Sequence, residues 1–129
     1  MKIAFTISRI LLGLIFTVFG LNGLYPFLHM PPIPPGLALQ YMTVLSTSHY
    51  FVAVCLLELI GGLILLSNRY IPVALCIIGP ILVNILLFHS LMEPSGLPLA
   101  FIVLILWAIV FYGVRFAFAS IFVAKAEVR

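Results

Sequence analysis

The sequence predicts an all-α membrane protein, a transmembrane four-helix bundle that runs up-down-up-down with both termini cytoplasmic. Three observations predict this class. Of the 129 residues, 65% are hydrophobic and 7% are charged, which is more apolar surface than a soluble domain of this size can bury. Four apolar stretches are each long enough to cross a bilayer. The six basic residues stand singly at segment ends, a pattern that indicates membrane topology and no nucleic-acid partner.

The four predicted transmembrane helices form one membrane domain that covers residues 1–129. They span approximately residues 7–28, 50–67, 71–91 and 97–118. Arg9 interrupts the N-terminal apolar run and no cleavage site follows it, so we expect a retained first helix rather than a signal peptide. Pro72 and Pro98 stand near the first turn of the third and fourth helices, where proline is tolerated. The last helix is expected to continue into the cytoplasm over residues 119–129.

The basic residues also predict the orientation of the bundle. Short connections make neighbouring helices antiparallel, and all six basic residues then fall on one side of the membrane. These residues are Lys2, Arg9, Arg69, Arg115, Lys125 and Arg129. The connection over residues 29–49 and the turn at Glu93 contain no lysine or arginine. The positive-inside rule therefore places both termini in the cytoplasm.

The first outer connection, residues 29–49, is expected to contain a short interfacial helix. It opens with the stiff run PPIPPG, which favours polyproline-like backbone. Leu37, Tyr41, Val44 and Leu45 then recur at helical spacing, with polar residues opposite them. Such an amphipathic helix lies in the outer membrane interface, either as a surface anchor or as a lid over the mouth of the bundle.

Glu58 is the candidate functional residue because it is a single charge within the second apolar stretch. An ionisable group at this depth costs roughly 2.5–3.5 kcal/mol on insertion scales, and it indicates a functional site by default. Gly61 and Gly62 share its side of the helix. Their small size either lets a neighbouring helix approach closely or leaves a cavity for a ligand.

Asn84 is the predicted partner of Glu58. Both residues lie roughly 10–12 Å below the outer surface, counted along their helices at 1.5 Å per residue. Antiparallel neighbours bring them to the same level, and an amide can donate a hydrogen bond to a buried carboxyl. Pro80 shares the Asn84 face and removes one helical hydrogen bond, a break that often accompanies a site in membrane helices.

Arg9 and Asn22 complete the polar residues of the first helix. Arg9 shares a face with Gly13, Gly20 and Gly23, and this glycine-rich face is predicted to point into the bundle. The Arg9 side chain either reaches Glu58 and keeps it ionised, or extends to the lipid headgroups. Asn22 either joins the polar cluster or caps the end of its helix.

The histidines and cysteines do not form a recognisable metal or disulfide pattern. His29, His49 and His89 lie near the outer surface, but no pair has the i,i+3 or i,i+4 spacing of helical ligands, so no metal site is predicted. His89 remains a candidate polar or proton-handling residue. Cys55 and Cys76 are expected at opposite depths, too far apart for a disulfide.

Three stretches together resemble the DoxX family of small four-helix membrane proteins. They are RILLGLIFTVFGLNG (Arg9–Gly23), LLELIGGLILL (Leu56–Leu66) and PILVNILLFHSLMEPSGLPLA (Pro80–Ala100). The similarity extends from Arg9 to about Trp107, and Gly23 stands where the family pattern has a basic residue. The resemblance implies a bacterial inner-membrane protein, and founding members of the family are associated with quinol oxidase and thiosulfate:quinone oxidoreduction.

The expected function follows from the polar residues and the resemblance. We expect an outer-half pocket that binds a small amphiphile, such as a quinone, or that supports a membrane redox complex, without enzyme activity of the chain on its own. The lining residues would be Glu58, Asn84, His89, Arg9 and Asn22. Two alternatives stay open: a small proton-coupled transporter and a ligand-free assembly partner. The expected partners are the lipid bilayer and either a redox protein or further copies of the chain.

Overall fold

Helices are the only regular secondary structure of the chain. The computed structural model describes all 129 residues and contains no strand. Four of its helical segments are long and apolar enough to cross a membrane, so the chain has the character of a multi-pass membrane protein. The elements are α1 (Lys2–Leu24), α2 (Leu37–Thr47), α3 (Tyr50–Ser67), α4 (Ile71–Leu91), the 3₁₀ turn η1 (Pro94–Gly96), α5 (Leu97–Val114) and the 3₁₀ segment η2 (Arg115–Phe122).

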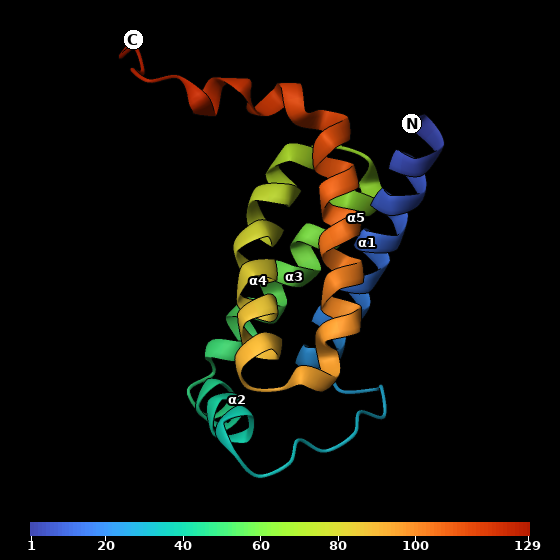
Figure 1. Cartoon of the computed structure of the whole chain (residues 1–129), viewed down its shortest axis with the longest axis vertical. Coiled ribbons are helices and arrows are strands. Elements are labelled where there is room, and N and C mark those ends of the chain that lie inside the picture. Colours follow the sequence, from blue (N-terminus) through green and yellow to red (C-terminus); the bar gives the residue numbers. More distant parts are fainter.

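The four long helices form a ring in which each packs against two neighbours. Helix α1 contacts α3 and α5, and α4 contacts the same two helices from the other side. Both chain termini and the α3–α4 connection lie at one end of the bundle, whereas α2 and the α4–α5 turn lie at the other end (Figure 1). The core follows the inner faces of all four helices, where Leu12, Leu65, Leu75, Ile78 and Val110 are fully buried.

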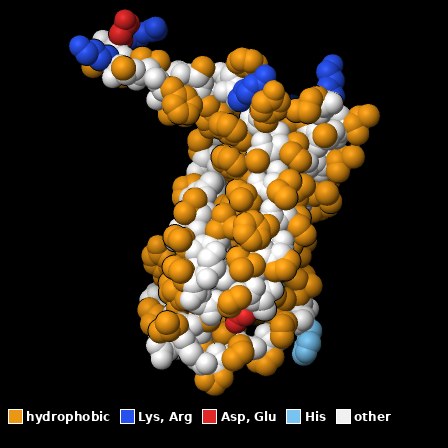
Figure 2. All heavy atoms as spheres, in the orientation of Figure 1, with side chains coloured by type: hydrophobic (Ala, Val, Ile, Leu, Met, Phe, Trp, Pro, Cys, Tyr) orange, Lys and Arg blue, Asp and Glu red, His pale blue; other side chains and the backbone are white.

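The outer surface of the bundle is apolar along its whole length. Figure 2 shows hydrophobic side chains covering the bundle between its two ends, and the lysines and arginines in view lie at the end that carries the termini. Exposed leucine, isoleucine and valine side chains occur on every long helix. A surface of this kind suits hydrocarbon, in which helices associate through close packing rather than through burial from water.

Helices α1 and α3 pack with their backbones in contact at glycine residues. A Cβ atom on Gly20 would lie 2.7 Å from the backbone nitrogen of Leu59, and one on Gly62 would lie 2.6 Å from that of Thr17. Gly61 instead faces α4, where a Cβ atom would lie 2.8 Å from Ile78. Successive helix residues point about 100° apart, so the two adjacent glycines serve two different neighbours. The close-packing role predicted as one alternative for Gly61 and Gly62 is confirmed.

The predicted helix in the first outer connection is confirmed as α2. Its residue Ala38 is buried, whereas Leu37 and Val44 remain exposed. The Tyr41 ring lies 5.6 Å from that of Phe88, which joins α2 to the C-terminal end of α4. Figure 1 shows α2 as a separate short helix at the end of the bundle.

The first helix starts and ends earlier than the predicted range of residues 7–28. It begins at Lys2 and ends at Leu24, because Tyr25 takes an extended conformation before Pro26. The Asn22 carboxamide oxygen then accepts hydrogen bonds from the backbone amides of Phe27 and Leu28 at 2.9 and 2.8 Å. This local cap stabilises the turn that ends the helix.

The predicted continuation of the last helix through residues 119–129 is wrong. Helix α5 ends at Val114, and η2 then turns away from the bundle axis (Figure 1). The Phe118 side chain turns back into the core, is only 7% exposed, and lies 5.0 Å from the Phe111 ring. The Arg115 guanidinium lies 3.9 Å from the Tyr112 ring centroid and donates to the Tyr112 carbonyl at 2.6 Å.

Candidate functional site

Glu58 lies near the middle of α3, on the side that faces the interior of the ring. Cys55 and Gly62 on one flank of α3 contact α1, Gly61 on the other flank contacts α4, and the helical phase of Glu58 falls between these flanks. Its side chain is half-buried. The chain supplies it with no hydrogen bond and no ion pair. The carboxyl group is therefore without a partner inside the chain.

Asn84 does not meet Glu58, so the predicted hydrogen bond between them is not formed. The Asn84 side chain is exposed on the outside of α4, and its amide nitrogen donates to the carbonyl of Pro80 at 2.9 Å. The two residues do occupy neighbouring helices. The prediction was wrong because it compared only the depths of the two residues along their helices and did not consider how α4 is rotated about its axis. The inner face of α4 is occupied by Leu75, Ile78 and Leu82.

Arg9 takes neither of its two predicted positions. Its side chain is only 7% exposed, and its guanidinium donates to the carbonyl of Leu65 and, at 3.4 Å, to that of Leu66. These carbonyls belong to the last turn of α3, which carries the negative end of the helix dipole; the Leu65 carbonyl also accepts from the backbone amide of Asn68 at 3.2 Å. The glycine-rich face of α1 points inward as predicted, since Gly13 and Gly20 are buried beside Arg9. Arg9 is thus a cap for α3.

Asn22 and His89 also serve local structure. The capping alternative for Asn22 is confirmed by its bonds to the turn after α1. The Nδ1 atom of His89 donates to the carbonyl of Glu93 at 2.8 Å, and its ring fills the space that a side chain on Gly96 would need. Because a carbonyl can only accept, Nδ1 carries the hydrogen of this bond. Both residues stabilise the chain at the end of a transmembrane helix.

Two polar side chains that the sequence did not single out lie inside the bundle. The Thr17 hydroxyl is buried at the α1–α3 contact beside Gly62 and has no partner. The Trp107 ring nitrogen donates to the carbonyl of Leu75 at 3.3 Å, which links α5 to α4. No sequence signal marked this contact, because a Cβ atom on the neighbouring Gly79 would lie at an ordinary 3.5 Å from the indole ring.

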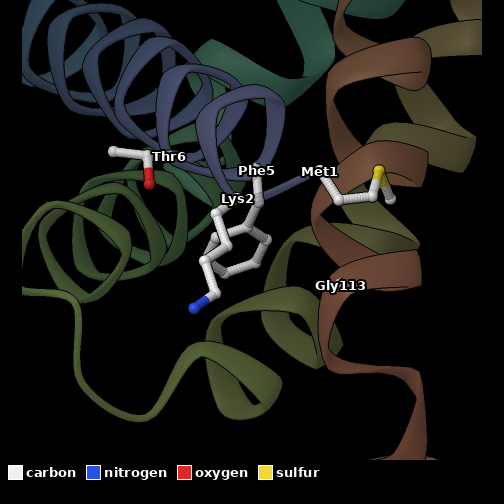
Figure 3. A pocket seen from close by; sticks show the side chains of 5 residues that line it. All are labelled: Met1, Lys2, Phe5, Thr6 and Gly113. Atoms are coloured by element: carbon white, nitrogen blue, oxygen red, sulfur yellow. The ribbon is translucent and has the colours of Figure 1, made fainter.

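Two shallow hollows lie at the N-terminal end of α1, away from the middle of α3. The larger, of about 320 Å³, is lined by Met1, Lys2, Phe5, Thr6 and Gly113 (Figure 3). Neither hollow is lined by any of the five predicted site residues. No three histidine, cysteine or acidic side chains come close enough together to hold a metal ion.

The arrangement of helices and the apolar surface define the class as a helical multi-pass membrane protein. Comparison with protein-family models, with curated proteins and with solved structures finds no match to this chain. The candidate site therefore rests on the chain's own geometry. That geometry reduces the five predicted residues to one free group, Glu58, while the other four bond to nearby backbone carbonyls or amides.

Proposed function

We propose that this chain is a DoxX-like protein of the bacterial inner membrane that crosses the bilayer up-down-up-down, with both termini in the cytoplasm. The short α3–α4 and α4–α5 connections support this topology. The lysines and arginines visible in Figure 2 lie at the end that carries the termini, and the positive-inside rule assigns such an end to the cytoplasm. On this topology α2 lies at the outer surface, where its exposed Leu37 and Val44 enter the interface.

The function that the geometry favours is the binding of a small amphiphile, such as a quinone, at Glu58. The observation that carries this proposal is a half-buried carboxyl in the middle of an apolar helix long enough to cross a membrane, with no partner in the chain. The other two acidic residues, Glu93 and Glu127, lie outside the long helices. An unpaired carboxyl in an apolar helix costs free energy. Such a group is retained in a protein when it binds a ligand or transfers a proton.

A carboxyl group is chemically suited to a quinone head group. As a carboxylate it accepts a hydrogen bond and a proton from a quinol hydroxyl, and as the neutral acid it donates to a quinone carbonyl. In this proposal the chain binds and orients the head group, and a partner redox complex exchanges the electrons. Arg9, Asn22 and His89 contribute by stabilising the helix ends and turns that position α3 within the ring.

A binding titration tests the proposal. The purified protein in lipid nanodiscs is titrated with a short-tailed ubiquinone analogue, and quenching of Trp107, the single tryptophan, reports binding. We expect saturable quenching that weakens roughly tenfold in Glu58→Gln, because a charge-assisted hydrogen bond is lost. The matched control Glu93→Gln should titrate like the wild type. Identical titrations for wild type and Glu58→Gln would show simple partitioning into lipid and reject the proposal.

A further inference from the structure

One face of α4 points away from the bundle along the whole length of the helix. Its residues recur at helical spacing and are all exposed: Val73, Cys76, Pro80, Val83, Asn84 and Leu87. We refer to these residues as the outward α4 face. Helix α2 approaches α4 on the adjacent flank, through Tyr41 on Phe88, and leaves the outward α4 face uncovered.

Asn84 makes this face unlike an ordinary lipid-facing surface. Its amide nitrogen gives one hydrogen to the Pro80 carbonyl, while its second N–H and its carboxamide oxygen have no partner in the chain. Asn84 lies seven residues before the end of α4 at Leu91, or roughly 10 Å along the helix axis. Its neighbours Val83 and Leu87 are exposed and apolar. In hydrocarbon, an unpaired amide is unfavourable and promotes association between helices.

We propose that a second copy of this chain docks on the outward α4 face, with Asn84 of one copy hydrogen-bonded to Asn84 of the other. Two copies with the same membrane orientation are related by a two-fold axis along the membrane normal. Every α4 residue then lies at the same depth as its counterpart. The carboxamide both donates and accepts, so it is complementary to its own copy.

A second copy fits this face better than an unrelated helix does. An unrelated partner would need its own polar group at the depth of Asn84, whereas a copy presents one there by symmetry. The apolar residues Val73, Val83 and Leu87 lie above and below the amide pair and supply the packing. The dimer is independent of the proposed role of Glu58, because that residue faces the interior of the ring.

The native cysteines allow a direct test. Cys76 is exposed on the outward α4 face, whereas Cys55 is buried and is removed as Cys55→Ser. Helices in contact lie 8–10 Å apart, so a short thiol-reactive cross-linker should join Cys76 to its counterpart in liposomes of phosphatidylethanolamine and phosphatidylglycerol. The control moves the single thiol to α5, as Cys76→Ser with Ile102→Cys, at a position that is also exposed. Cross-linking through α5 but not through Cys76 would overturn the proposal.

Substitution of Asn84 distinguishes the contribution of the amide to association from that of the surrounding apolar residues. Subunit counting by single-molecule photobleaching, over a series of protein-to-lipid ratios, should show association roughly fivefold or more weaker in Asn84→Leu. Asn84→Gln, which retains the amide, should keep most of the association. Thermal unfolding checks that each variant remains folded, since the one hydrogen bond lost lies within α4. Monomers at every ratio, monomers carrying a bound lipid, or unchanged association of Asn84→Leu would each reject the dimer.

Discussion

The guanidinium of Arg9 donates to the main-chain carbonyl of Leu65, which lies 56 residues away on the neighbouring helix. This bond joins the beginning of α1 to the end of α3. The two helices are also in backbone contact at Gly20 and Gly62. The α1–α3 pair is therefore held by glycine packing along its length and by a charge-assisted hydrogen bond at one end, and both interactions can be tested separately.

Replacing Arg9 by leucine should destabilise the bundle. The last turn of α3 loses its cationic cap, and hydrogen bonds to charged groups contribute about 1.5–3 kcal/mol. We expect the free energy of unfolding, measured in mixed micelles by circular dichroism, to fall by about that amount. Lys2→Leu removes a basic residue that has no such bond and should have little effect. Equal stability of Arg9→Leu and the wild type would show that the cap is dispensable.

Gly62→Ala should disrupt the α1–α3 contact, because the new methyl group would meet the backbone nitrogen of Thr17 at 2.6 Å. Overpacking of this kind costs about 1–3 kcal/mol, since backbone cannot move aside as a flexible side chain can. Gly79→Ala is the matched control. Its methyl group would lie 3.5 Å from Trp107, an ordinary contact, and alanine also favours the helix. Thermal unfolding in the same detergent should give a lower unfolding temperature for Gly62→Ala than for Gly79→Ala. An unchanged unfolding temperature for Gly62→Ala would contradict the close approach of α1 and α3.

Glu58→Leu should leave the fold intact and raise its stability. The carboxyl has no partner to lose, and an ionisable group in the apolar span is unfavourable by roughly 2.5–3.5 kcal/mol on insertion scales. We therefore expect a higher free energy of unfolding together with weaker quinone binding. Glu58→Gln should stay close to the wild type in stability. A marked loss of stability in either variant would point instead to a structural role for this carboxyl.

Gly96→Ala should distort the turn between α4 and α5. The His89 ring occupies the position that the alanine methyl group would take, so the ring must leave its bond to the Glu93 carbonyl. We expect the His89 side-chain resonances to shift in NMR spectra and the unfolding temperature to fall. His89→Ala combined with Gly96→Ala should recover part of this loss, because the smaller side chain vacates the space. Additive losses in the double variant would indicate that the two residues act independently.

The sequence predicted much of the local structure because local signals encode it. The apolar stretches marked the four long helices, and the spacing of Leu37, Tyr41 and Val44 marked α2. The capping alternative for Asn22 was available from its place before Pro26. The end of α5 was missed, because the bend after Val114 accompanies the return of Phe118 to the core. A continuous hydrophobic sequence does not indicate that the chain bends and brings Phe118 back to the core.

By itself, the sequence determined that this is a helical membrane protein with a lone carboxyl in its second long helix, since composition and segment length are properties of the chain alone. Only the tertiary structure decided which polar groups meet. Depth can be counted along a helix, but the rotation of each helix depends on how glycine and bulky faces fit against their neighbours. The rotation of the helices directs Asn84 outward, places Arg9 within hydrogen-bond distance of the last turn of α3, and leaves Glu58 without a partner.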